Sequence, residues 1–138
     1  MKRKKLTASM IALVMSVSLP MTTYAANWYL EDGSVTVKAD NSGQTVTQGG
    51  GSAVPDEAPV ITQRESSVET GNTIAISTSD NAAANVTIKD INIKSSNDAI
   101  DVKGSSSANI TLEGDNKIFS ETGSAPVSYT HLTLPTNR

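Results

Sequence analysis

Two short segments of the chain repeat each other: NVTIK at residues 85–89 and NITLE at residues 109–113. Apolar and polar side chains alternate in both, so each segment predicts a β-strand with one apolar face and one polar face. Three further short segments alternate in the same way, and turn-forming residues separate all five. The side chains expected to face the core are Ile74, Ile76, Val86, Ile88, Ile91, Ile93, Ile100, Val102, Ile110 and Leu112.

A second repeat supports the first, because the isoleucines at positions 74 and 76 return as Ile100 and Val102 after nearly the same interval. Two kinds of strand that return at nearly the same interval are typical of a β-solenoid with three strands per turn. We therefore predict an all-β fold, an incomplete right-handed parallel β-helix with about 24 residues per turn, in which the two repeated segments pair in parallel. The alternative is an antiparallel β-sandwich, because short alternating strands can also form hairpins.

Residues 1–25 predict a secretory signal peptide. They begin with the basic stretch MKRKK, and residues 6–19 form an apolar stretch that is too short for a comfortable membrane span. Thr23 and Ala25 are the small residues that signal peptidase requires before the cut. We expect an exported protein, either secreted or attached to the cell surface, with no membrane span after cleavage.

Removal of this peptide changes the charge balance of the chain. It takes away four basic and no acidic side chains, and leaves seven basic and 14 acidic ones with a net charge near −7. Such a surface repels phosphate backbones, so nucleic acid is not an expected partner. The chain has no cysteine, which excludes disulfides, thiolate metal sites and cysteine nucleophiles.

The remaining chain divides into three parts. Residues 26–71 alternate less regularly, and we expect short strands there, at Val35 and Val37, in GQTVTQ and in PVITQ. They form either a cap over the open end of the solenoid or a tether that follows the signal peptide. Residues 72–125 are expected to form the solenoid turns. Residues 126–138, PVSYTHLTLPTNR, resemble the translation of a transposase-type sequencing adapter, so we predict a non-native tail without a consistent place in the fold.

Several of these segments together resemble the N-terminal part of large secreted surface proteins of Gram-positive gut bacteria. The segments are ANWYLEDGSVTV, GQTVTQG, PVITQ, NVTIKDINI and NITLEGDNKI, and the resemblance covers residues 26–120. Those proteins are repetitive and similar to parallel β-helix proteins with carbohydrate-binding or adhesin-like roles. The resemblance implies a non-catalytic surface module that binds extended polysaccharide or host glycan.

The outward side chains of the two repeated strands are the predicted ligand-binding residues, Thr87, Lys89, Thr111 and Glu113. A solenoid presents such hydroxyl and charged groups on long flat faces, which suit an extended polysaccharide. Asn85 and Asn109 begin the two strands and are predicted to form a structural amide ladder. A structural stalk that projects a distal domain is the alternative function, because aromatic platforms for sugar stacking are few.

Catalysis is not expected, and no cofactor is predicted apart from a candidate Ca²⁺. His131, the only histidine, lies in the predicted tail and is set aside. A fragment of a β-helix polysaccharide lyase is the second alternative, because such enzymes combine a calcium-binding acidic cluster with a basic residue. The candidate Ca²⁺ ligands are Asp98 and Asp101, although Asp at a turn more simply hydrogen-bonds to backbone amides.

Overall fold

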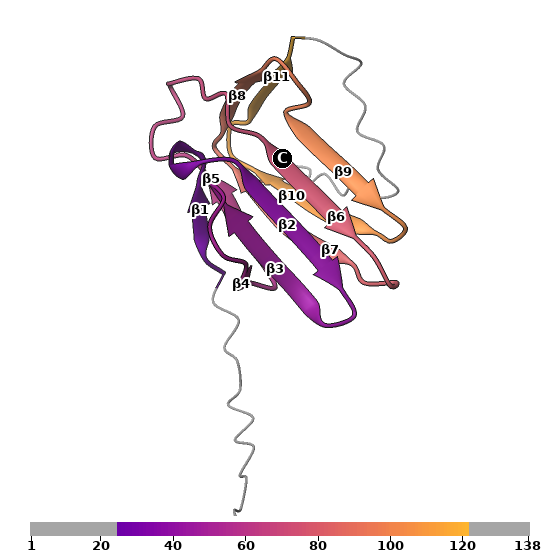
Figure 1. Cartoon of the computed structure of the whole chain (residues 1–138). Coiled ribbons are helices and arrows are strands. Elements are labelled where there is room, and N and C mark those ends of the chain that lie inside the picture. The colour runs from indigo at the N-terminus through magenta and orange to yellow at the C-terminus, as the bar shows by residue number, and fades with distance from the viewer. Residues whose placement is uncertain (1–24, 122–138) are drawn as a thin grey trace, which may run out of the picture.

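The computed structural model describes residues 25–121. The apolar stretch of the predicted signal peptide at residues 6–19 and the predicted tail at residues 126–138 lie outside the described residues. The described residues form strands and one short 3-10 helix (Figure 1). Their bounds are β1 Asn27–Tyr29, η1 Leu30–Asp32, β2 Val35–Asp40, β3 Gly43–Gln48, β4 Val54–Pro55, β5 Val60–Thr62, β6 Ile74–Thr78, β7 Ala84–Lys89, β8 Asn92–Ser95, β9 Ile100–Gly104, β10 Ala108–Glu113 and β11 Lys117–Ser120.

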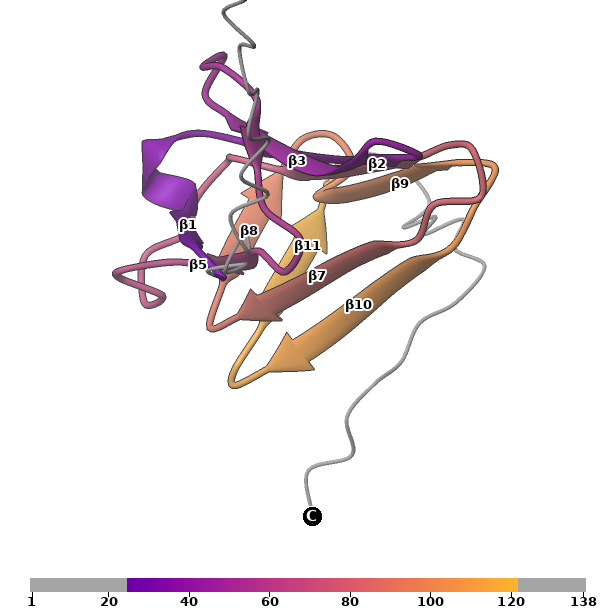
Figure 2. The ribbon, with the colours of Figure 1, turned by 90° about the horizontal axis from the view of Figure 1, so that it is seen from below.

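The strands form three sheets. The four-stranded sheet has the order β1-β5-β7-β10, and all its neighbouring strands are parallel. The five-stranded sheet has the order β4-β3-β2-β6-β9, in which β2, β6 and β9 are parallel whereas β2, β3 and β4 are antiparallel. Strands β8 and β11 form a parallel pair, and Thr70 makes a parallel bridge to Ile93 of β8. Figure 2 shows the two larger sheets facing each other, with β8 and β11 between them at one side.

The chain visits these sheets in a repeating order. Strands β6, β7 and β8 enter the five-, four- and two-stranded sheets in turn, and β9, β10 and β11 repeat that order. The predicted parallel pairing is confirmed, because residues 85–89 of β7 lie in register with residues 109–113 of β10. Residues 74 and 76 of β6 likewise lie in register with residues 100 and 102 of β9.

The predicted all-β class is confirmed, and the described residues contain no α-helix. The structure differs from the predicted regular parallel β-helix in the five-stranded sheet, which is mixed. The antiparallel part is β3 and β4, which the chain inserts after β2 through a turn at residues 41–42. The sandwich alternative required antiparallel pairing of the repeated strands, and these strands are parallel. No helix in the described part of the chain is long and apolar enough to cross a bilayer.

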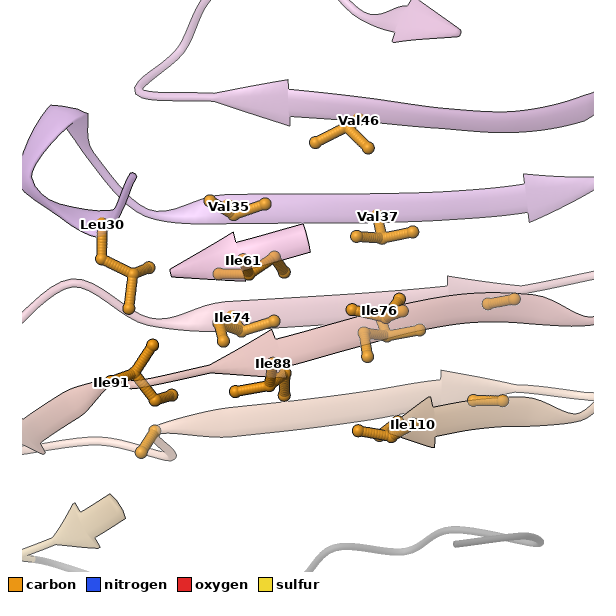
Figure 3. Packing of buried hydrophobic residues seen from close by; sticks show 14 of the residues in the cluster. Leu30, Val35, Val37, Val46, Ile61, Ile74, Ile76, Ile88, Ile91 and Ile110 are labelled. Atoms are coloured by element: carbon orange, nitrogen blue, oxygen red, sulfur yellow. The ribbon is translucent and has the colours of Figure 1, made fainter. Parts of the chain in front are cut away.

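The core lies between the sheets and consists of the inward side chains of successive strands (Figure 3). Of the residues predicted to face it, Ile74, Ile76, Val86, Ile88, Ile91, Ile93 and Ile110 are buried. The other predicted inward residues of the last strands are partly buried and pack against this cluster; they are Ile100, Val102 and Leu112. Their greater exposure follows from their position, because no described strand covers β9 and β10 on the side away from β6 and β7.

Residues 26–71 contribute strands to the same sheets as the later residues. Leu30 in the 3-10 helix is fully buried, and the indole nitrogen of Trp28 donates to a carboxylate oxygen of Asp56 at 2.8 Å. Several side-chain amides also bridge this region. Nε2 of Gln48 donates to the carbonyl oxygens of Tyr29 and Gly33. Nδ2 of Asn72 donates to the carbonyl oxygen of Leu30.

Candidate functional site

Four predicted site residues lie side by side on the outward face of the four-stranded sheet. Thr87 of β7 is in register with Thr111 of β10, and Lys89 is in register with Glu113. Neighbouring strands lie about 4.8 Å apart, so both pairs are within reach of each other. The intervening side chains of these strands are apolar and face the core, which leaves the polar ones on the outside.

Lys89 and Glu113 form an ion pair across β7 and β10. The Lys89 Nζ atom lies 3.8 Å from Oε2 of Glu113, and each side chain is about half exposed. A pair of this kind adds less than about 1 kcal/mol to stability, because solvent screens it. Its main effect is on the charge of this outward surface, because the two opposite charges offset each other.

Two rows of side chains continue from these residues onto β5 and β1. One row consists of Asn27, Val60, Thr87 and Thr111. The other consists of Tyr29, Thr62, Lys89 and Glu113. We call these eight residues the two-row face.

Sequence reasoning missed the members of this face on β1 and β5. A signal for β5 was present, because Ile61 precedes its register partner Ile88 by nearly the interval that separates Ile88 from Leu112. The short strand β1 carried no comparable spacing signal, because a hairpin separates it from the strand with which it pairs.

A charged cluster lies beside Tyr29, at the β1 end of the second row. The Arg64 guanidinium carbon lies 4.1 Å from the centre of the Tyr29 ring, within the range of a cation–π contact. The same guanidinium donates to both carboxylate oxygens of Asp32, at 2.9 and 2.7 Å. The hydrogen bonds from Arg64 lower the pKa of Asp32 below its ordinary value, and the bond to Asp32 raises the pKa of Arg64. The cluster holds one side of the Tyr29 ring in place.

The predicted ladder residues Asn85 and Asn109 are brought together. They are register partners on β7 and β10, and Nδ2 of Asn109 donates to Oδ1 of Asn85 at 3.0 Å. Asn85 is the second residue of β7 and Asn109 is the second residue of β10. The contact links one strand to the next and leaves further amide groups at the surface.

The candidate calcium ligands Asp98 and Asp101 do not lie in an arrangement typical of a metal site. Asp101 lies on β9, and one of its carboxylate oxygens is 2.6 Å from the Lys103 Nζ atom. This hydrogen bond raises the pKa of Lys103, and the charge of Asp98 adds to the effect. Within residues 25–121, no group of three or more His, Cys, Asp or Glu side chains is arranged to hold a metal ion. Calcium binding by Asp98 and Asp101 therefore stays a prediction without geometric support.

An acidic side chain in the turn after β7 and an amide side chain in the turn after β10 bond to backbone amides instead. Oδ1 of Asp90 accepts a hydrogen bond from the Asp115 amide at 2.9 Å, and Oδ1 of Asn116 accepts one from the Ile91 amide at 3.3 Å. These bonds connect the turn after β7 to the turn after β10. Their role is structural, as is usual for Asp and Asn in turns.

The two-row face can therefore donate and accept hydrogen bonds along four strands. It presents hydroxyls, a carboxamide, a phenol, one pair of opposite charges and the apolar side chain of Val60. Such groups match sugar hydroxyls better than they match a phosphate or a strongly charged ligand. Comparison of the chain with family models, curated proteins and solved structures finds no match.

Proposed function

We propose that the chain forms a capped right-handed parallel β-helix in an exported protein and binds extended polysaccharide or host glycan without catalysing a reaction. The architecture is supported by the repeated order in which β6 to β11 enter the three sheets. Crossovers between parallel strands are almost always right-handed. In this proposal the antiparallel strands β3 and β4 belong to the cap, because they cover the edge of β2.

One observation carries the binding proposal: the two-row face keeps seven polar side chains, interrupted only by Val60, in register across four parallel strands. Register of this kind presents hydrogen-bonding groups at a regular spacing of about 4.8 Å in one direction. An extended polysaccharide also repeats along its length, so it can engage several side chains of one row at once. Export is supported by the predicted signal peptide at residues 1–25.

The experiment is retention of the exported chain on a panel of neutral and acidic polysaccharides. A variant that changes Thr87, Lys89, Thr111 and Glu113 to Ala removes four outward side chains and no buried one. We expect it to lose at least about 10-fold in affinity, because several hydrogen bonds to the ligand are removed. Circular dichroism checks that the variant keeps its β-structure.

A matched control uses the outward face of the five-stranded sheet. It changes Thr36, Thr47, Lys38 and Asp101 to Ala, and so removes the same numbers of threonine, lysine and acidic side chains. We expect the control to bind as the parent does. Equal loss of retention in both variants would count against binding by the two-row face.

A structural stalk is the second candidate, and a specific observation favours it. The outward Asn85–Asn109 and Lys89–Glu113 pairs satisfy each other between neighbouring strands. Side chains that pair in this way link neighbouring strands, and they are then less available to hydrogen-bond to a ligand. Absence of retention across the whole panel would favour the stalk. Cleavage of a pectin-like polysaccharide would contradict both candidates and favour the lyase alternative.

A further inference from the structure

The carboxylate of Asp56 is buried in the connection between β4 and β5, where the residue is only 5% exposed. Its two side-chain oxygens accept three hydrogen bonds. Oδ1 accepts one from the Ala58 amide at 3.1 Å. Oδ2 accepts one from the Trp28 indole nitrogen at 2.8 Å and one from the Ala26 amide at 3.3 Å. All three donors are neutral, so none of them offsets the charge of the carboxylate.

The charge of Asp56 has no cationic side chain as a partner within residues 25–121. The four ion pairs in this part of the chain all involve other carboxylates. Neutral donors lower the free-energy cost of burying a carboxylate, but a buried charge is usually paired with an opposite charge as well. The surroundings of Asp56 therefore favour a cation at one of the positions that the neutral donors occupy.

The nitrogen of Ala26 is held beside this carboxylate by the sheets. The Ala26 carbonyl accepts from the Val60 amide at 3.0 Å, which extends the pairing of β1 with β5 by one residue. Asp56 is fixed in turn by Gln44 of β3: its amide donates to the Gln44 carbonyl at 3.1 Å, and its carbonyl accepts from Nε2 of Gln44 at 2.9 Å. The separation between the Ala26 nitrogen and Asp56 is thus set by β1, β3 and β5, all of which remain when residues 1–25 are removed.

The predicted signal-peptide cleavage changes the chemistry of this same nitrogen. Cleavage after Ala25 hydrolyses one peptide bond. Water supplies the hydroxyl group of the new Ala25 carboxyl group and a proton to the Ala26 nitrogen, which becomes an α-amino group. An α-amino group is mostly protonated at neutral pH, so the nitrogen beside Asp56 then carries a positive charge.

We propose that removal of the signal peptide between Ala25 and Ala26 creates the cation that Asp56 lacks, and that the resulting ion pair stabilises the folded chain after export. This inference rests on the export that is part of the proposed function and on cleavage after Ala25. It goes further because it makes cleavage a structural step: the precursor offers Asp56 a neutral amide, and the processed chain offers an ammonium group at the same atom. A hydrogen bond between two charged groups is roughly twice as strong as one between neutral groups.

The experiment compares the exported full chain with a variant in which Ser-Gly-Ser is inserted between Ala25 and Ala26. The intact mass of each purified product shows where the signal peptide was removed. Both products keep an N–H donor at Ala26, but only the first carries a charge there. We expect the insertion to raise the equilibrium constant for unfolding in urea about tenfold in the wild-type background, and less than about twofold in Asp56→Asn, which has no charge to pair.

Glu57→Gln is the matched control. Glu57 is exposed and follows Asp56 directly, and its carboxylate accepts from the Gln44 amide at 3.0 Å. The insertion should raise the unfolding constant in this variant as much as in the wild-type background. An equally small effect of the insertion in Glu57→Gln and Asp56→Asn would assign the loss to general surface charge and overturn the ion pair.

A second measurement does not require Asp56→Asn to fold. At neutral pH the α-amine of Ala26 should react with acetic anhydride at least about fivefold more slowly in the folded chain than in urea, because the ion pair keeps it protonated. The α-amine of the inserted Ser should react at similar rates in both. Mass spectrometry of the N-terminal peptide measures both rates.

The two readouts separate failure of this inference from failure of the proposed function. A signal peptide that is kept, or removed at another bond, would overturn both the ion pair and the cleavage on which it rests. Cleavage after Ala25 together with an unprotected α-amine, or with equal effects of the insertion in the wild-type and Asp56→Asn backgrounds, would overturn the ion pair alone. Retention on polysaccharide tests the two-row face independently of either result.

Discussion

The side-chain amide of Gln44 hydrogen-bonds to both backbone groups of Asn85, as a neighbouring strand would. Nε2 of Gln44 donates to the Asn85 carbonyl at 3.0 Å, and Oε1 accepts from the Asn85 amide at 2.8 Å. Gln44 lies on β3 of the five-stranded sheet, whereas Asn85 lies on β7 of the four-stranded sheet. Strand β5 pairs only with residues 87–89 of β7, so Gln44 satisfies the backbone that β5 leaves uncovered.

The first prediction concerns this contact. Gln44→Ala removes the partners of the Asn85 amide and carbonyl, and also a bond from Nε2 to the Asp56 carbonyl at 2.9 Å. Gln44 is only 2% exposed, so these groups are left poorly solvated. We expect the free energy of unfolding in urea to fall by about 2–4 kcal/mol. Thr45→Val, one residue away and directed outward, should change it by less than about 0.5 kcal/mol. Similar effects of both substitutions would contradict this role for Gln44.

The second prediction concerns the Asn85–Asn109 pair. A double-mutant cycle with Asn85→Ala and Asn109→Ala should give a coupling energy of about 0.5 kcal/mol, because the bond joins exposed neutral groups. Urea unfolding of the four proteins measures this value. The same cycle on Asn85 and the exposed Asn41, which lies in the turn between β2 and β3, should show no coupling. Strict additivity for Asn85 and Asn109 would show that the ladder adds no stability.

The third prediction compares two glycines with positive φ. Gly104 has a φ of 129°, and a Cβ atom there would lie 2.0 Å from the Thr78 carbonyl oxygen. Gly50 has a φ of 76°, and a Cβ atom there would meet nothing within 4 Å. Gly50→Ala should cost about 1 kcal/mol through backbone strain alone. Gly104→Ala should cost at least about 2 kcal/mol more, because β6 must move away. Equal thermal stabilities of the two variants would argue against this close approach of β6 and β9.

The fourth prediction concerns acid unfolding. The hydrogen bonds from Arg64 depress the pKa of Asp32, so folding favours the ionised carboxylate. The stabilisation is present above the pKa of Asp32 in the unfolded chain, about 3.9, and is lost as the pH falls through the lower folded value. Asp32→Asn should therefore lower the melting temperature at pH 6 but make little difference at pH 2.

The control for this titration is Glu69→Gln, which removes an exposed charge of the same sign. It should leave the melting temperature nearly unchanged at both pH values. A difference between wild type and Asp32→Asn that stays constant from pH 6 to pH 2 would show that the ion pair is not its cause.

The regular part of the fold could be predicted because its signals are local and repeated. Alternation in residues 85–89 and 109–113 indicated strands, and their constant spacing indicated register. The Lys89–Glu113 contact then followed from register alone. The outward residues of β7 and β10 could be grouped for the same reason.

The N-terminal part could not be predicted to the same depth, because an insertion hides the repeat. Val35 pairs with Ile74, and the interval between them is much longer than the interval between Ile74 and its next partner, Ile100. The hairpin strands β3 and β4 lie between β2 and β6 in sequence and add antiparallel pairs to an otherwise parallel arrangement. Tyr29 and Thr62 were consequently missed as members of the two-row face.

The sequence by itself determined which segments of residues 74–113 are strands and which of their side chains face the core, because a period of two residues is set by local backbone geometry. Only the tertiary structure decided how the first strands join them. That step depends on long-range contacts such as Gln44 to Asn85 and Trp28 to Asp56, in which one side chain satisfies polar groups far away in the sequence. No local pattern encodes such a partner, because the partner is selected by the polar groups that neighbouring strands leave unpaired.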